Sequence, residues 1–235
     1  MRLKEDHNAV FFSRTIHKKF VFDVAGYDNP VIKASSNKKL GKKVTNGRLK
    51  GAPIYTLTLE ERKTCSRDCE HWLDCYGNNM GFAHRFKAGA DLEVRIIREI
   101  SALAKKHPDG FLVRLHVLGD FYSVPYVNMW AELLERYPAL NIYGYTRHNP
   151  DNHTDKSRAI GRAVAQTHEK YKLRFMVRMS NQPEDLFSAN GEDLISEADA
   201  ITCLSQNKDK EKRKTCAECG LCWAFTKKPI RFLTH

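Results

Sequence analysis

From residue 54 onward, short apolar runs alternate with longer segments that carry an apolar residue every three or four positions. The short runs are rich in β-branched and aromatic residues, and such runs predict buried strands. They lie at 54–59, 111–118, 141–146, 173–180 and 200–204. The pattern therefore predicts five strands spread over most of the chain.

The longer segments have the spacing of amphipathic helices. Leu92, Ile96 and Ile100 share one helical face, and Asp91 can cap the start of that helix. Ser123 can cap the next one. Helices are predicted at 91–103, 123–134, 154–170 and 184–189.

Strands and helices that alternate with short connections are typical of a parallel sheet. We expect an α/β fold, namely a partial (β/α) barrel of about five to six parallel strands, with a doubly wound sheet as the alternative. In both folds, ligands bind at the carboxyl ends of the strands. The chain divides into an irregular basic N-terminal region at 1–50, the partial barrel at 51–206 and a cysteine-rich tail at 207–235.

Composition narrows the classes of protein that remain. The 235 residues are enough to bury a core without disulfides. We expect no membrane contact and a reducing cytoplasm, because the sequence shows neither a secretory leader nor a run of about eighteen apolar residues. Clustered cysteines in that compartment are typical of metal sites rather than disulfides. No Walker loop, G-x-S-x-G elbow or H-E-x-x-H motif is present.

Positive charge is concentrated near the N-terminus. Lysine and arginine outnumber aspartate and glutamate by 39 to 28, which gives a net charge of +11. The stretch 31–50 has no acidic residue, so it could follow a phosphate backbone or could be only a solvated surface. Nucleic acid is one candidate partner, through Lys33, Lys38, Lys39, Lys42, Lys43, Arg48 and Lys50.

The seven cysteines fall into two groups with the spacing of metal ligands. Cys65, Cys69 and Cys75 form the first group, just after the first predicted strand. Three thiolates leave one coordination position of a metal open, unless His71 or His84 completes a structural zinc site.

The second cysteine group contains a C-x2-C-x2-C run. Cys216, Cys219 and Cys222 form the run, and Cys203 is the expected fourth ligand. The run resembles that of bacterial ferredoxins, so it favours an iron–sulfur cluster over zinc, which more often uses two separated pairs. Two alternatives stay open, since the seven thiols could interleave in one site or form disulfides.

Polar residues also gather where the predicted strands end. Arg114 and His116 alternate with apolar neighbours, so we expect both on one polar face of their strand. Polar groups at three strand ends would meet on one rim and could bind a small molecule. The candidate cofactor-binding residues are Gly119, Asp120, Thr146, Arg147, Ser180 and Asn181.

The first cysteine loop resembles that of radical S-adenosylmethionine enzymes, which keep three cysteines after the first strand of a (β/α) barrel. The spacing here is C-x3-C-x5-C, wider than the C-x3-C-x2-C usual in that superfamily. The resemblance implies a [4Fe–4S] cluster with one open iron that binds S-adenosylmethionine. It also implies that Gly119 and Asp120 take the place of a Gly-Gly-Glu stretch that holds the amino group of this cofactor, and a plain turn is the alternative, because Gly-Asp is common in turns.

A second resemblance extends over most of the chain. Its marks are Asn37-Lys38-Lys39-Leu40-Gly41, Leu118-Gly119-Asp120-Phe121, Gly144-Tyr145-Thr146 and Cys219-Gly220-Leu221-Cys222-Trp223. Together these stretches are similar to the phage family known as gene product 88. The resemblance implies a phage or prophage protein in the cytoplasm of a bacterial host, and it implies no particular reaction.

Two functions remain as hypotheses. The first is an iron–sulfur enzyme of the radical S-adenosylmethionine type, whose second cluster is structural or takes electrons from a donor protein. The second is a non-enzymatic phage protein that binds nucleic acid and is stabilised by iron–sulfur or zinc. An enzyme needs an open coordination position at the first cysteine group, whereas a binding module needs a closed site.

Overall fold

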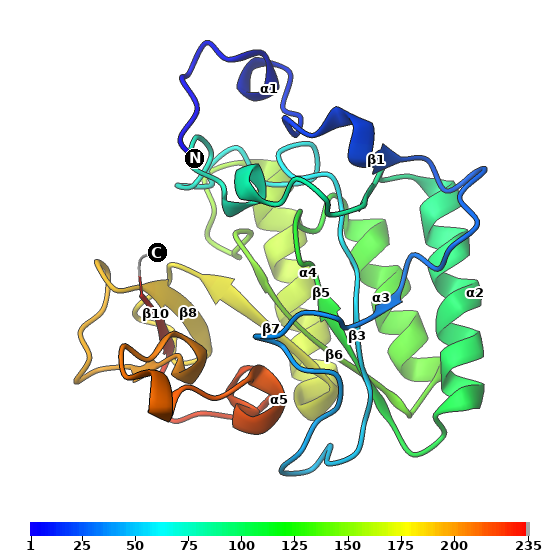
Figure 1. Ribbon diagram of the computed structural model, residues 1–235, viewed down its shortest axis with the longest axis vertical. Helices are drawn as coiled ribbons and strands as arrows, with labels where there is room; N and C mark the ends of the chain where they lie inside the picture. The colour runs from blue at the N-terminus through cyan, green and yellow to red at the C-terminus, as the bar shows by residue number, and fades with distance from the viewer. Residues whose placement is uncertain (234–235) are drawn as a thin grey trace.

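The computed structural model describes residues 1–233, and an eight-stranded sheet lies at its centre (Figure 1). The strand order is β2-β3-β5-β6-β7-β8-β10-β9, and every neighbouring pair is parallel except β2 and β3. The mixed α/β class with a mainly parallel sheet is thus confirmed. The strands are β2 (Lys33–Ala34), β3 (Ile54–Thr56), β5 (Phe111–Leu115), β6 (Leu140–Thr146), β7 (Phe175–Ser180), β8 (Ser188–Gly191), β9 (Ile201–Thr202) and β10 (Ile230–Phe232).

Three long helices lie side by side along the sheet (Figure 1). They are α2 (Ala90–Lys106), α3 (Val124–Arg136) and α4 (Asp155–Tyr171), and they precede β5, β6 and β7 in the chain. The predicted cap of α3 is confirmed, because the Ser123 hydroxyl accepts a hydrogen bond from the Tyr126 N–H at 3.2 Å. Helix α2 is capped by Gly89 instead of Asp91, whose carboxylate lies in the first turn and favours the positive end of the helix dipole.

The remaining elements are short. Helix α1 (Asn8–Phe11) is near the N-terminus and helix α5 (Cys216–Cys219) is in the tail. Strands β1 (Val21–Phe22) and β4 (Arg85–Phe86) form a separate parallel pair. No helix in the described part of the chain is long and apolar enough to cross a membrane.

Alternation along the strands divides the core into two layers. Phe111 and Leu115 of β5 belong to the apolar cluster that includes the three long helices. Leu112 belongs to a second cluster on the other side of the strand, with Leu40 and Trp223. Two segments that are far apart in the sequence, the basic N-terminal stretch and the cysteine-rich tail, therefore cover the sheet face that the helices leave open.

The C-terminal strand β10 was not predicted from the sequence. Ile230 pairs with Ala189 of β8 on one side and with Ile201 of β9 on the other. The chain leaves the sheet after β9, forms the cysteine-rich tail and returns to fill the position between two earlier strands (Figure 1). The tail is thereby anchored to the sheet at both ends.

Two local predictions were wrong. Residues 184–189 form a turn that leads into β8 instead of a helix, because Asp185 accepts a hydrogen bond from Phe187 N–H and Ser188 pairs with Met179. His116 does not share the face of Arg114, since β5 ends at Leu115.

His116 turns toward helix α3. Its Nε2 lies 3.0 Å from the Tyr126 hydroxyl, and its ring meets Phe121 edge to face. Burial lowers its pKa from 6.5 to about 3. His116 is therefore a neutral core residue at physiological pH rather than part of the polar strand face.

Candidate metal centres

The first cysteine group lies on the loop between β3 and β4, and two buried arginines fix this loop. Arg62 donates from Nε to the Trp72 carbonyl at 2.9 Å and from Nη2 to the Asn78 side chain at 2.8 Å. Arg85 forms an ion pair with Glu61 at 2.7 Å, and both side chains are almost fully buried. The arginines give the loop a rigid framework although it contains little regular structure.

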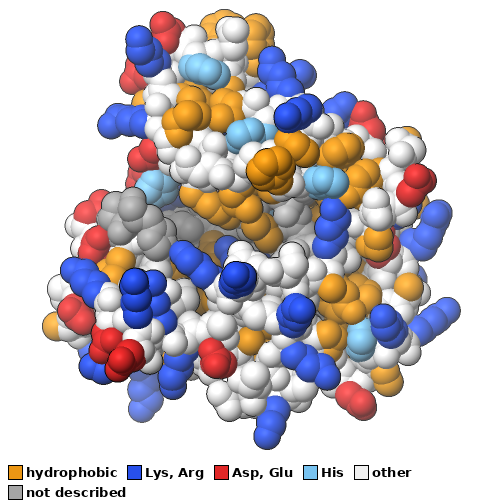
Figure 2. Space-filling view, viewed as in Figure 1, with side chains coloured by type: hydrophobic (Ala, Val, Ile, Leu, Met, Phe, Trp, Pro, Cys, Tyr) orange, Lys and Arg blue, Asp and Glu red, His pale blue; other side chains and the backbone are white. Residues whose placement is uncertain are grey.

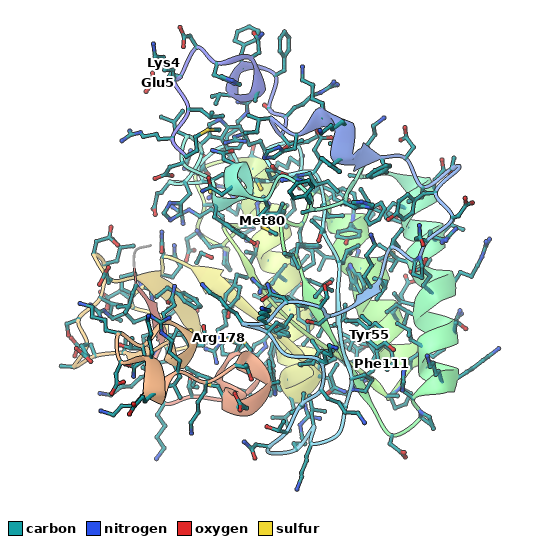
Figure 3. All side chains as sticks on the ribbon, in the orientation of Figure 1. Lys4, Glu5, Tyr55, Met80, Phe111 and Arg178 are labelled. Carbon is teal, nitrogen blue, oxygen red and sulfur yellow. The ribbon has the colours of Figure 1, made fainter. Side chains whose placement is uncertain are left out.

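The guanidinium of Arg85 also closes the end of the loop. It donates to the backbone carbonyls of Gly77, Met80 and Ala83 at 2.9, 3.1 and 2.6 Å. These three residues follow Cys75, and Met80 lies above the ends of the central strands (Figure 3). The position of Cys75 is thus set from both sides.

Gly119 and Asp120 pack directly against the start of the loop. Gly119 has a φ of +84°, and a Cβ there would lie 2.6 Å from both Leu59 Cβ and Thr64 Oγ1. The Asp120 N–H donates to the Thr64 hydroxyl at 3.2 Å. A glycine is required at 119 because its backbone is left-handed and because it touches the residue before Cys65.

Arg147, at the end of β6, links the cysteine loop to the sheet. Its backbone N–H donates to Asp120 Oδ2 at 2.8 Å. Its guanidinium donates to the Asp68 carbonyl at 3.3 Å, to the Ser180 carbonyl at 3.3 Å and to Glu70 Oε1 at 3.2 Å. The predicted convergence of strand ends on one rim therefore brings Asp120, Arg147 and Ser180 together beside the loop.

The other predicted cofactor-binding residues are partly used by the protein itself. The Asn181 side chain donates to Glu70 Oε2, which adds a further link between the β7 end and the loop. The Thr146 hydroxyl accepts from the His148 N–H at 3.1 Å and is almost fully buried. Thr146 thus stabilises its own turn, whereas Asn181 holds the cysteine loop.

The three thiols of the first group influence one another. Burial raises the pKa of Cys65 well above its usual value, with Asp120, Cys69 and Cys75 adding to the shift. Burial is also the main cause that raises the pKa of Cys69 to about 11 and raises that of Cys75. Backbone N–H groups act in the opposite direction. The His71 N–H lowers the pKa of Cys69, and the Gly77 N–H lowers that of Cys75.

Neither candidate histidine joins the first group through its ring. The His71 side chain is 73% exposed and lies 3.3 Å from Asp74. His84 Nδ1 lies 2.7 Å from the Tyr27 hydroxyl, and the His84 ring packs against Phe22. The histidines that could have closed the site as structural zinc ligands therefore have other contacts.

The second cysteine group has a different support. Cys203, Cys216, Cys219 and Cys222 line one small cavity, together with Ser205 and Leu221. Helix α5 carries Cys216 and Cys219 and begins with a capping box between Thr215 and Glu218. The structure therefore brings together the four cysteines that the spacing had assigned to one site.

The basic N-terminal stretch holds this tail in place. The Lys39 and Leu40 carbonyls accept from the N–H groups of Cys216 and Ala217 at 2.8 and 2.9 Å. Gly41 has a φ of +83°, and a Cβ there would lie 2.6 Å from Ala217 Cβ. This contact between residues far apart in the sequence could not be read from local spacing.

The thiols of the second group differ in ionisation. A hydrogen bond from the Cys222 thiol lowers the pKa of Cys216, and the same interaction, with burial, raises that of Cys222. The Tyr145 hydroxyl donates to Cys222 Sγ at 2.8 Å. Burial raises the pKa of Cys203 and Cys219, and backbone N–H groups two positions on, from Ser205 and Leu221, oppose these shifts.

Single metal ions and iron–sulfur clusters require different arrangements of donor atoms. As placed, no group of three or more His, Cys, Asp or Glu side chains among the described residues could hold a metal ion. A single zinc ion needs donors that converge at about 2.0–2.3 Å. The thiolates of an iron–sulfur cluster bind different irons and lie farther apart, and N–H groups that face the sulfurs are part of such sites. The all-thiol chemistry of both groups fits cluster ligation.

Two arginines near the second group had no assigned role in the sequence analysis. Arg178 of β7 is fully buried and lies against the tail (Figure 3), where its Nη2 donates to the Ala224 carbonyl at 2.8 Å. Arg114 of β5 lies among Tyr76, Tyr143 and the second cysteine group. The sequence signal that could have found them is the alternation of polar and apolar residues along β5 and β7, which indicates the face of the sheet that each arginine occupies.

The basic residues of the 31–50 stretch have two kinds of environment. The Lys33 ammonium donates to the Tyr27 hydroxyl at 2.6 Å, and Arg48 donates to the Asn141 side chain at 3.0 Å. Figure 2 shows Lys and Arg spread over the viewed face rather than gathered into one patch. The remaining cations of the stretch are exposed: Lys38, Lys39, Lys42, Lys43 and Lys50.

Comparison with known proteins gave one match, to a family. No curated protein and no solved structure matched the chain. The profile of the phage family described as Gene product 88 matches residues 30–224, which include both cysteine groups, the Gly119-Asp120 turn and the strand ends around them. Because the match covers most of the sequence, the chain belongs to the Gene product 88 family.

Proposed function

We propose that the protein is an iron–sulfur enzyme of the radical S-adenosylmethionine type, built on a partial (β/α) barrel. One observation carries the proposal: the loop with Cys65, Cys69 and Cys75 lies at the carboxyl ends of parallel strands and is packed on Gly119 and Asp120. In parallel α/β folds this edge of the sheet is where ligands bind.

The three thiolates of the first group would hold a [4Fe–4S] cluster with one iron open to S-adenosylmethionine. When bound, the cluster supplies the electron that cleaves this cofactor. The Asp120 carboxylate accepts one N–H at each oxygen, from Phe121 and Arg147, and a carboxylate has about four acceptor positions. Asp120 therefore retains capacity to accept from an ammonium group.

The rim residues have a positioning role in this proposal. Arg147 and Asn181 bind Glu70 of the loop from two neighbouring strand ends, so they hold the cysteines at a fixed place above the sheet. Gly119 lets the backbone approach closely, while Thr146 and Ser180 complete the turns on which the loop rests. A ligand at this rim would meet polar groups that are already ordered.

The second group would hold a closed four-thiolate cluster that is structural or carries electrons. Cys203 follows β9, and the other thiols lie in the tail that precedes β10. A cluster bound there would tie both ends of the tail to the sheet. Such thiols need a reducing compartment, and we propose the cytoplasm of the host cell.

The test is cofactor cleavage by anaerobically purified protein. With dithionite and S-adenosylmethionine, the intact protein should form 5′-deoxyadenosine, and the Cys65→Ala, Cys69→Ala and Cys75→Ala variants should not. Ser66→Ala is the matched control, because Ser66 is a buried loop residue without a thiol. A fully iron-loaded protein that binds no S-adenosylmethionine would show that the radical mechanism is wrong.

A second candidate function is nucleic-acid binding with structural metal sites. The exposed lysines of the stretch that holds the cysteine tail favour it. Binding to DNA or RNA should then weaken steeply with salt, and neutralising Lys38, Lys39, Lys42 and Lys43 should flatten that dependence. An unchanged salt dependence would leave the lysines as a solvated surface.

A further inference from the structure

The second cysteine group lies beside a buried positive charge that the described protein leaves incompletely paired. Arg178 is 0% exposed, and its Nη2 donates to the Ala224 carbonyl and to Thr226 Oγ1, at 2.8 and 3.3 Å. Its Nε and Nη1 find no hydrogen-bond partner among residues 1–233. A buried guanidinium in this state is costly unless an anion lies near it.

The groups around Arg178 indicate where that anion would be. Burial lowers its pKa, and the ionisable groups that oppose the shift are Cys222, then Tyr145 and then Asp185. Its guanidinium stacks at 4.3 Å over the Phe187 ring, which covers it on one side. Tyr145, the cross-strand neighbour of Arg178, donates to Cys222 Sγ at 2.8 Å, so this part of β7 lies beside the second cysteine group.

A second arginine approaches the same group from a neighbouring part of the sheet. Arg114 Nε is also buried without a partner among the described residues. Tyr143, the cross-strand neighbour of Arg114, packs against Trp223, the residue after Cys222, with ring centroids 5.0 Å apart. Strand register pairs Arg114 with Tyr143 and Tyr145 with Arg178, which is consistent with one shared face.

We propose that Arg178 and Arg114 are the counter-charges of an anionic iron–sulfur cluster at Cys203, Cys216, Cys219 and Cys222, and that they raise its affinity for an electron. The inference rests on the proposed function, and it makes this cluster a carrier of electrons rather than a purely structural centre. Four thiolates around an iron–sulfur core form a net anion, and one added electron makes it more negative. Nearby positive charge therefore stabilises the reduced form.

The electron comes from a low-potential one-electron donor, which is dithionite in the experiment, and no bond forms or breaks. The full chain would carry Cys65→Ala, Cys69→Ala and Cys75→Ala, so that only the second group is observed. A reductive titration followed by absorbance and electron paramagnetic resonance then gives the midpoint potential. Arg178→Met is compared with Arg178→Lys, which keeps the charge.

Removing one of these charges should weaken electron affinity about tenfold, which is about 59 mV for a one-electron couple. Arg178→Met and Arg114→Met should each lower the potential, and Arg178→Lys should restore most of it. Arg174→Met is the matched control, because Arg174 donates to the Leu134 and Tyr137 carbonyls instead of facing the cysteines. Its potential should equal that of the parent protein.

The possible failures are distinguishable. An unchanged potential in both Met variants, with iron and sulfide retained, would overturn the counter-charge role and leave the cluster proposal intact. Parent protein without iron and sulfide at the second group would overturn the proposed function itself. If Arg178→Met loses the cluster while Arg178→Lys keeps it, the result supports a need for the positive charge. The midpoint potential of Arg114→Met then tests the counter-charge role.

Discussion

Each cysteine group lies beside a fully buried arginine, and the two arginines differ in how their charge is balanced. Arg85, next to the first group, forms a 2.7 Å ion pair with Glu61 and donates to three backbone carbonyls. Arg178, next to the second group, has two nitrogens without partners among the described residues. Both side chains are 0% exposed, so burial alone does not explain the difference.

The two cysteine groups therefore differ in how the buried charge beside the thiols is balanced. In the first loop Glu61 balances the charge of Arg85, and contacts from the strand ends hold the loop, although Arg62 Nη1 and Glu61 Oε1 have no partner among the described residues. At the second site Arg178 is buried with two nitrogens that have no hydrogen-bond partner among the described residues, and we propose that a bound anion balances its charge. Metal should therefore matter little for the shape of the first loop and much for the stability of the tail.

The largest expected effect comes from breaking the complete pair. Glu61→Gln should lower the free energy of unfolding by about 3–5 kcal/mol, because it leaves the Arg85 charge buried and unpaired. Arg178→Met in metal-free protein should cost far less, since it removes a charge that has no anionic partner. Urea unfolding of both metal-free variants measures the difference, and equal losses would contradict the contrast between the two sites.

Two glycines test whether the sites are independent. Gly119→Ala and Gly41→Ala should each cost roughly 2–4 kcal/mol, from left-handed backbone strain and from overpacking against a Cβ contact. Gly119 touches the first loop through Thr64, and Gly41 touches the tail through Ala217. Each variant should lose iron only at its own site. Iron lost equally from both sites in either variant would show that they form one unit.

The smallest effect is expected from the exposed lysines. Changing Lys38, Lys39, Lys42 and Lys43 to glutamine should shift the free energy of unfolding by less than about 0.5 kcal/mol per site, because these side chains are solvated. The segment holds the tail through backbone carbonyls, which the substitutions keep. Loss of iron from the second group in this variant would mean that the lysine side chains themselves support the site.

Local pattern predicted the elements that carry their own periodic signal. Helices α2, α3 and α4 and strands β5, β6 and β7 lie where apolar spacing placed them, and the Gly119-Asp120 turn does lie beside the first cysteine loop. The grouping of the four tail cysteines also followed from spacing. In each case the interacting residues are close together in the sequence, or they lie at the ends of strands that neighbour each other in the sheet.

Long-range contacts could not be predicted in this way. Strand β10 has three residues and enters the sheet between strands that precede it by about thirty to forty positions, and no local pattern specifies that place. Leu3 and Val10 pack with Trp72 on the cysteine loop, so part of the expected N-terminal extension covers the first site. Arg178 falls within the strand predicted at 173–180, but the missing partners of its side chain become visible only when the tail is placed against β7.

The most direct measurement is iron, acid-labile sulfide and zinc per chain after anaerobic purification, for the intact protein and for one alanine variant in each group. The intact protein should contain iron and sulfide for two clusters. Cys69→Ala should lose the first cluster with little change in the free energy of unfolding, whereas Cys219→Ala should lose the second and be less stable. Stoichiometric zinc without sulfide would contradict the iron–sulfur assignment at both sites.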